Sequence, residues 1–186
     1  AICDHSKSLK IAHGLDETGL MKQVEEIDRL NEKIKGFQIL KGTEVDILVD
    51  GRLDLSEKTL EKLDLVIAAI HSGFKQDREK MTKRIIRAIE NPFVHILAHP
   101  SGRLLGARDP YEVEMDELME AAKKYGKALE VNAYFERLDL DDIQCRKAKE
   151  MGIQVGIGTD AHHLDQMWMM SLGVAVARRG WLETQD

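Results

Sequence analysis

The sequence is poor in cysteine and has no long hydrophobic run. Cys3 and Cys145 are the two cysteines among 186 residues. They are too few and too far apart for a disulfide framework or a four-cysteine zinc site, so we expect two ordinary buried thiols. The longest uncharged apolar stretch, from Val66 to Ile70, is far shorter than the roughly 20 residues of a membrane span. No secretory leader opens the sequence, and we therefore expect a soluble, cytoplasmic protein with no membrane partner.

The chain also lacks the features that divide a protein into domains. No proline- and serine-rich linker, internal repeat or low-complexity tract interrupts it, and we expect residues 1–186 to form one domain. Hydrophobic residues make up 43% of the sequence, which excludes intrinsic disorder and predicts a sizeable core. The formal net charge of -6 argues against a protein that holds nucleic acid mainly through its own positive field, although it leaves room for a local basic patch.

Apolar, β-branched runs alternate with segments of helical spacing along the whole sequence. Such alternation predicts an α/β fold in which crossover helices join parallel strands. Glycine or proline follows most of the predicted helices, where each helix should end. We expect helices over residues 17–35, 76–90, 112–125 and 140–151, and strands over 1–3, 38–42, 63–70, 94–98, 128–131 and 154–157.

Polar side chains follow the predicted strands. The carboxyl ends of parallel strands lie at one edge of a sheet or barrel, so these side chains should gather there. Packing several imidazoles and carboxylates together without a cation costs roughly 1 to 3 kcal/mol for each group left unsatisfied, and a divalent metal removes that cost. The polar groups concerned are His5, Glu44, His71, His99, Asn132, Asp160 and His162.

The residue types indicate which metals and which chemistry to expect. Imidazole and carboxylate together suit zinc, manganese or iron, whereas calcium and magnesium prefer oxygen alone. Asp160 and His162, two residues apart at the end of a strand, would point to the same side and reach one ion. Several ions together activate water and clamp phosphate oxygens, so phosphoester hydrolysis fits best. Arg103, four residues after His99, is placed to contact phosphate bidentately, unless it is simply a solvent-exposed arginine.

Six segments carry most of these residues, and the tail over 173–182 adds a further stretch. The segments are Asp4-His5-Ser6-Lys7-Ser8-Leu9, Gly42-Thr43-Glu44-Val45-Asp46-Ile47, Ile70-His71-Ser72-Gly73-Phe74, Ala98-His99-Pro100-Ser101-Gly102-Arg103-Leu104-Leu105, Glu130-Val131-Asn132-Ala133 and Gly158-Thr159-Asp160-Ala161-His162. In this order they resemble the polymerase-and-histidinol-phosphatase (PHP) domain, and more narrowly its version at the C-terminus of bacterial and archaeal family X DNA polymerases.

The resemblance implies a distorted (β/α)7 TIM-like barrel with up to three divalent ions, typically Mn²⁺ or Zn²⁺, with Mg²⁺ as a further option. It implies a 3′-5′ exonuclease of DNA repair that uses a metal-bound hydroxide, with abasic-site endonuclease or 3′-phosphatase activity in some members. Arg103, Asp160 and His162 would then be catalytic. The metal ligands of the family that match this sequence are His5, Glu44, His71, His99, Asp160 and His162.

One part of the family pattern is absent from this sequence. The first motif, a His-x-His followed shortly by an Asp, would lie before Ala1. We therefore expect a PHP domain that is incomplete at its N-terminus, whose missing ligands come from an upstream segment, with polymerase domains upstream in the parent chain. A full β/α barrel runs to about 250 residues, which agrees with this expectation.

The expected substrate is a DNA 3′ end, single-stranded or gapped. Lys7, Phe74, Arg103 and Asn132 are the candidate substrate contacts, with Lys7 at backbone phosphates and Phe74 stacked on a terminal base. A solvated Lys7 and a Phe74 packed in the core are the alternatives. Two other functions stay open. The first is a small-molecule phosphatase such as a histidinol phosphatase, and the second is a non-catalytic module that braces a polymerase.

Overall fold

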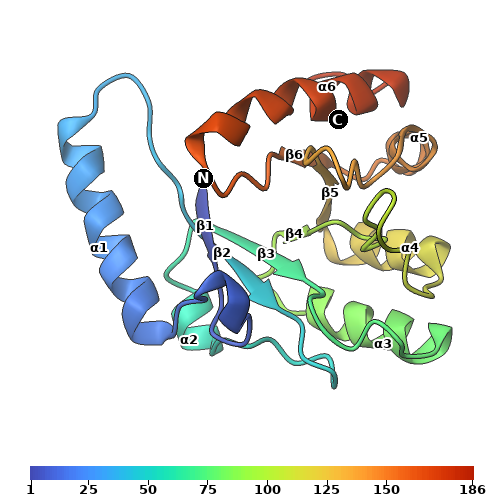
Figure 1. Cartoon of the computed structure of the whole chain (residues 1–186), viewed down its shortest axis with the longest axis horizontal. Coiled ribbons are helices and arrows are strands. Elements are labelled where there is room, and N and C mark those ends of the chain that lie inside the picture. Colours follow the sequence, from blue (N-terminus) through green and yellow to red (C-terminus); the bar gives the residue numbers. More distant parts are fainter.

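Six parallel strands form the centre of the molecule and follow one another in chain order across the sheet, from β1 to β6. The computed structural model describes all 186 residues. The helices lie around the curled sheet (Figure 1). The strands are β1 (Ile2–His5), β2 (Lys41–Asp46), β3 (Leu65–Ala69), β4 (Ile96–Leu97), β5 (Ala128–Asn132) and β6 (Val155–Gly158). The helices are η1 (Lys10–Ala12), α1 (Glu17–Lys33), α2 (Glu57–Leu60), α3 (Arg78–Ile89), α4 (Met115–Tyr125), α5 (Asp142–Met151), η2 (Leu164–Met169) and α6 (Met170–Arg179).

The helix ends follow local sequence signals. Asp16 and Asp77 cap the N-termini of α1 and α3, because each carboxylate accepts a hydrogen bond from a backbone N–H in the first turn. Gly126 and Gly152 end α4 and α5 in the left-handed conformation, as predicted. The four predicted helices and the alternation of strand and helix are confirmed, which shows an α/β fold compatible with a distorted TIM-like barrel.

The predicted position of the second strand, β2, was wrong. The apolar run before Gly42 suggested a strand over 38–42 that ends ahead of Glu44, whereas β2 begins at Lys41 and runs to Asp46. Phe37 is 66% exposed and Leu40 is 39% exposed, so this apolar run contributes little to the core. Glu44 therefore lies within a strand rather than after one.

The sheet is open, with β1 and β6 as its two edges. Its curl nevertheless brings the ends of these strands together, because Nε2 of His5 at the end of β1 lies 3.3 Å from Nε2 of His162, which follows β6. Six strands are present, and the count of seven that the resemblance implies is not confirmed. The carboxyl ends of all six strands meet at this rim.

A single core of 26 buried hydrophobic residues supports the rim from below. α3 and α4 supply several of its large side chains, among them Met81, Ile85, Leu118 and Met119. None of the helices is long and apolar enough to cross a membrane. In the methionine-rich segment of η2, Met169 is buried, whereas Met167 and Trp168 are more than half exposed.

Candidate metal centre

Glu44 lies at the centre of the polar rim, where three imidazoles surround its carboxylate. Its Oε1 is 3.1 Å from Nε2 of His99 and 3.3 Å from Nε2 of His71. Its Oε2 is 3.4 Å from Nδ1 of His5. Burial alone would raise the pKa of Glu44, but hydrogen bonds from His71 and His99 hold it well below its usual range. Glu44 is therefore an ionised carboxylate, buried among nitrogen ligands.

His71 is held by a second carboxylate, Asp46, two residues along β2 from Glu44. Nδ1 of His71 donates to Oδ1 of Asp46 in a short hydrogen bond. The Asp46 carboxylate also accepts a hydrogen bond from the Ser8 hydroxyl, and the backbone N–H of Asp46 donates to Ser6 Oγ at 2.9 Å. Burial lowers the pKa of His71, but the two carboxylates outweigh it and raise the pKa to about 9. With its proton held at Nδ1, a neutral His71 presents Nε2 to the centre, as metal-binding histidines do.

Asp46 is a residue that the sequence analysis did not single out as part of the site. Residues two apart on a strand point to the same face, so Asp46 shares the face of Glu44. The alternation of side chains along β2 could have identified Asp46, but the strand was predicted over 38–42 and so did not include this residue.

The second half of the rim joins His5 to the loop after β6. His5 contacts His162, as above, and Nδ1 of His162 lies 3.6 Å from Oδ1 of Asp160. Oδ2 of Asp160 accepts from Nδ2 of Asn132 at 3.1 Å. Burial lowers the pKa of His5, which favours its neutral, ligating form. The side chains of all six predicted ligands thus form one continuous set of contacts.

Two of the six predicted ligands have strained backbones. His99 has φ of 27° and Asp160 has φ of 50°, in the left-handed region that residues other than glycine seldom occupy. Such strain persists only where the surroundings hold it, and it clusters at functional sites. For His99 the support is Glu130, whose carboxylate accepts the His99 backbone N–H at 2.8 Å. Burial, and then the charge of Glu44, raise the pKa of Glu130 to about 8.

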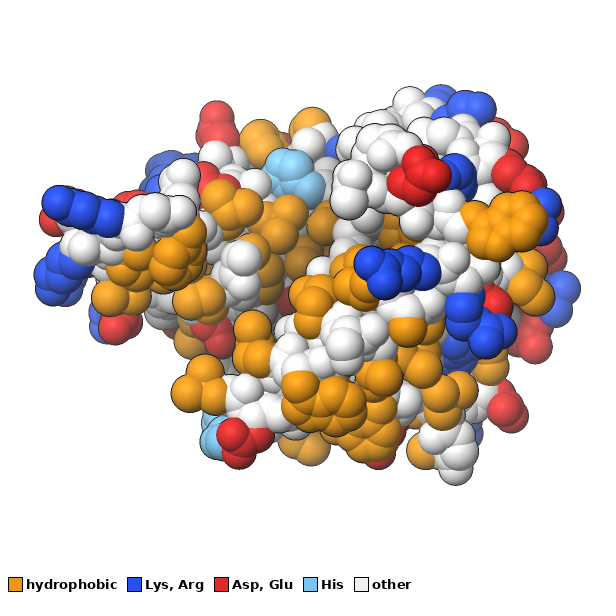
Figure 2. Space-filling model, turned by 90° about the horizontal axis from the view of Figure 1, so that it is seen from above, with side chains coloured by type: hydrophobic (Ala, Val, Ile, Leu, Met, Phe, Trp, Pro, Cys, Tyr) orange, Lys and Arg blue, Asp and Glu red, His pale blue; other side chains and the backbone are white.

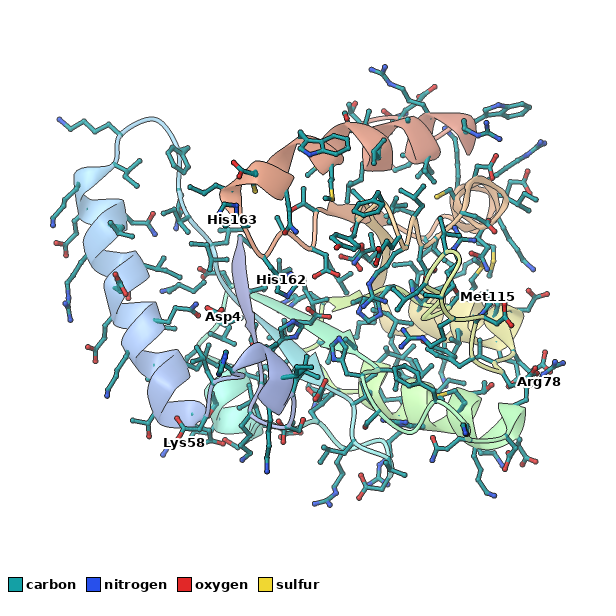
Figure 3. The ribbon with its side chains drawn as sticks, viewed as in Figure 1. Asp4, Lys58, Arg78, Met115, His162 and His163 are labelled. Atoms are coloured by element: carbon teal, nitrogen blue, oxygen red, sulfur yellow. The ribbon has the colours of Figure 1, made fainter.

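The residues at this centre fit a divalent metal ion. Ligand atoms of His5, Glu44 and His71 all lie within 4.8 Å of one another. Nδ1 of His99 is buried without a hydrogen-bond partner, and Nδ1 of His5 makes no hydrogen bond beyond its 3.4 Å contact with Glu44. Buried nitrogens of this kind are costly unless something else binds there. Imidazole nitrogen with carboxylate oxygen is a donor set that zinc and manganese accept. Figure 3 shows His162 next to the first strand, where it contacts His5.

Comparison with known proteins bears on the identity of this rim. No protein-family model matches the chain. The chain is 47% identical over all 186 residues to the DNA polymerase/3′-5′ exonuclease PolX of Bacillus subtilis, in the PHP-bearing C-terminal part of that protein. This chain belongs to the PHP family. It is also 41% identical over 141 residues to a probable phosphatase of Caldanaerobacter subterraneus, and 41% identical over 143 residues to one of Thermoanaerobacter sp..

This PHP chain spans only part of each relative. It covers 33% of the B. subtilis polymerase and 53% and 56% of the two probable phosphatases. As a share of this chain, the alignment covers all of it for the polymerase and 70% and 72% of it for the two probable phosphatases.

The predicted substrate contacts of the PHP rim do not form one set of contacts, as the predicted ligands do, but lie in different surroundings. The Arg103 guanidinium donates to the carbonyls of Arg137 and Leu138 and lies 3.6 Å from an Asp141 oxygen. Lys7 is exposed. Asn132 is buried, and its amide bonds to Glu130, Asp160 and the Tyr134 backbone.

The ring contacts of Phe74 are with Tyr111 and Arg108 and not with a predicted ligand. Its ring stacks on Tyr111 with centroids 6.4 Å apart, and the Arg108 guanidinium covers it at 4.0 Å. Phe74 also packs against the core. Arg137, by contrast, was not predicted from the sequence, and its Nε lies 3.3 Å from Oδ2 of Asp160.

Proposed function

We propose that this chain is the metal-dependent phosphoesterase domain of a family X type polymerase, which removes nucleotides from DNA 3′ ends during repair. Divalent ions are its cofactors, with Mn²⁺ or Zn²⁺ favoured by the donor set. One observation carries the proposal: a buried, ionised Glu44 surrounded by three imidazoles. It is supported by the 47% identity to a protein named a polymerase and 3′-5′ exonuclease.

Each residue at the rim has a task in this proposal. His5, Glu44, His71 and His99 would hold metal on one side, and Asp160 with His162 on the other. Bound ions would lower the pKa of water and neutralise phosphate oxygens.

Residues behind the ligands keep them in place. Asp46 keeps the Nδ1 proton of His71 and so leaves Nε2 free to ligate. Asn132 orients Asp160 by donating to its Oδ2. Glu130 fixes the His99 backbone. We propose that these groups preorganise the site before substrate arrives.

The surface charge fits a substrate that is attracted by the bound ions. Acidic and basic side chains lie interspersed on the face shown in Figure 2, which has no continuous basic surface. With a net charge of -6, the side chains do not provide a broad positive field for DNA. Cations at the rim would be the largest local positive charges there.

Release of nucleotides from a DNA 3′ end tests the proposal. The full-length gene product and the 186-residue chain would each be incubated with Mn²⁺ and a 5′-labelled single-stranded oligonucleotide. We expect the full-length protein to shorten the oligonucleotide stepwise from its 3′ end, in a reaction that EDTA abolishes and that Glu44→Gln reduces by at least about a hundredfold. The 186-residue chain, which lacks the first His-x-His motif of the family, should be less active or inactive. Glu61→Gln, at an exposed position, is the matched control. Full-length wild-type protein that binds Mn²⁺ but shortens no DNA would overturn the proposal.

A second candidate function is hydrolysis of a small phosphate monoester. It is favoured by the 41% identity to two proteins named probable phosphatases. The same site would serve, since ions that clamp phosphate oxygens act on monoesters and diesters alike. Turnover of histidinol phosphate would be compared with turnover of single-stranded DNA under identical metal conditions. A higher kcat/KM for the monoester would favour this second function.

A further inference from the structure

A pocket of about 220 Å³ opens beside the candidate metal centre. Asp160 and His162, both predicted ligands, form one part of its wall. The remaining wall combines an arginine, an aromatic ring, an aliphatic side chain and an amide, which are Arg137, Tyr134, Leu104 and Gln166. His162, which lines the pocket, is labelled in Figure 3. The pocket thus joins the predicted ligands to side chains that no step of the proposed reaction has yet used.

Arg137 reaches this pocket with hydrogen-bond donors to spare. Its only polar side-chain contact is the one from Nε to Asp160, at 3.3 Å. Nη1 is buried and has no hydrogen-bond partner, and the side chain as a whole is 14% exposed. A buried guanidinium nitrogen without an acceptor is costly. Because Arg137 lines the pocket, a small rotation of its guanidinium would bring Nη1 onto an anion there and remove that cost.

Arg103 is built differently, because its guanidinium faces backbone carbonyls and the Asp141 carboxylate. Its Nε donates to the backbone carbonyl of Arg137 at 2.9 Å, and its Nη2 donates to the carbonyl of Leu138. The turn that carries Arg137 is closed by hydrogen bonds from the Arg137 and Leu138 N–H groups to the Tyr134 carbonyl, at 2.8 and 3.1 Å. Leu138 adopts φ of 45°. Arg103 therefore holds a strained turn from behind, and this turn presents Arg137 to the site.

We infer that Arg137 binds the phosphate of the substrate, and that Tyr134 and Leu104 form the wall on which the attached nucleoside lies. Arg103 is a positioning residue for Arg137. The inference rests on the proposed function and deepens it, since it names a nucleotide as the group that the pocket takes. Guanidinium suits phosphate because its N–H groups meet two oxygens at once. Tyr134 can stack on any base, since stacking is tolerant of sequence.

Binding measurements test this without any need for turnover. Mn²⁺-loaded protein would be titrated calorimetrically with inorganic phosphate and with thymidine 5′-monophosphate. Arg137→Ala should weaken both ligands by about ten- to hundredfold, and Arg137→Lys should fall between, because it keeps charge but loses the fork. Tyr134→Ala should weaken the nucleotide by about tenfold or more and leave phosphate unchanged. Arg146→Ala, whose side chain is 51% exposed, is the matched control.

Two further readouts separate the possible outcomes. Metal content by mass spectrometry should be equal in wild type and in the Arg137 and Tyr134 variants. Added guanidinium ion should restore nucleotide binding to Arg137→Ala but not to Arg103→Ala, where the turn itself is disturbed. Unchanged binding by Arg137→Ala would overturn the inference. If the wild type binds nucleotide through Arg137 yet hydrolyses no DNA, the proposed exonuclease function fails and the inference stands.

Discussion

Replacing Asp46 by asparagine should destabilise the metal-free protein in a pH-dependent way. Burial lowers the pKa of His71, yet the nearby Asp46 and Glu44 raise it from 6.5 to about 9. At about 1.4 kcal/mol per pKa unit, the two carboxylates together stabilise the His71 imidazolium by about 3 kcal/mol, net of burial. The His71 side chain is only 10% exposed, so water screens this interaction little. The hydrogen bond from Asp46 is the leading favourable cause, and a hydrogen bond to a charged group is worth about 1.5 to 3 kcal/mol.

The sign of the pH dependence follows from the raised pKa. Because His71 has a higher pKa in the folded chain than in the unfolded one, this stability is fully present below pH 6.5 and is lost as the pH rises through about 9. Asp46→Asn should therefore cost about 2 kcal/mol at pH 6. At pH 10 the loss should fall below about 1 kcal/mol, the value of a neutral hydrogen bond.

Urea unfolding of metal-free protein at pH 6 and at pH 10 measures this difference. Both proteins would be treated with EDTA, and the free energies of unfolding would be obtained by linear extrapolation. Asp109→Asn, at an exposed position, removes the same charge and should change stability by less than about 0.5 kcal/mol at either pH. An equal loss at pH 6 and pH 10, or no loss at pH 6, would refute the reasoning.

Three further predictions concern the same rim. Gly158→Ala would place a Cβ 2.2 Å from Oε1 of Glu130, so it should displace the carboxylate that supports His99 and cost about 1 to 3 kcal/mol in urea unfolding. Arg84→Met should lower stability by more than about 2 kcal/mol, because the buried Arg84 guanidinium donates to the carbonyls of Ile47, Leu48 and Ser72, and the buried Ile47 carbonyl would lose this donor. Metal affinity should rise about tenfold per pH unit up to pH 9, since His71 must lose a proton to bind, and calorimetry in two buffers should detect its release.

Each of these has a matched control and a contradicting result. Gly156→Ala meets only Ile96 Cδ1, at 3.1 Å, and equal costs at the two glycines would contradict the role given to Glu130. Arg87→Met removes one donor to the Asp50 carbonyl at the surface, and a loss equal to that of the Arg84 variant would show that burial is not the cause. A metal affinity independent of pH would mean that His71 does not bind the ion.

The general plan of the fold could be predicted from the sequence, because the hydrophobic periodicity of its helices and most strands agrees with where they pack. β2 is the exception. Its face toward the rim carries Glu44 and Asp46, so the strand has polar residues where a core strand would be apolar. Functional sites are where local pattern and fold disagree. α6 was not predicted as a helix either, since Gly173 weakens its helical pattern. The glycine is needed there, because a Cβ would lie 2.5 Å from Ile157.

The candidate site was predictable as far as residue types follow strands. All six predicted ligands come together, and whether they bind metal stays a prediction. Arg137 could not be distinguished from Arg103 by sequence spacing. What separates the two is the turn in which Leu138 adopts a left-handed conformation. The carbonyls of this turn accept hydrogen bonds from Arg103, whereas Nη1 of Arg137 has no hydrogen-bond partner. Such a turn depends on long-range contacts that no local pattern encodes.

The metal centre is tested most directly by diffraction from crystals grown with Zn²⁺, using anomalous scattering at the zinc edge. We predict a peak within about 2.0 to 2.3 Å of a Glu44 oxygen and of at least one imidazole nitrogen from His5, His71 or His99. The same peak should vanish in crystals of Glu44→Gln. Zinc bound only at the exposed His13 or His163, with none at Glu44, would contradict the assignment of this rim as a metal-dependent active site.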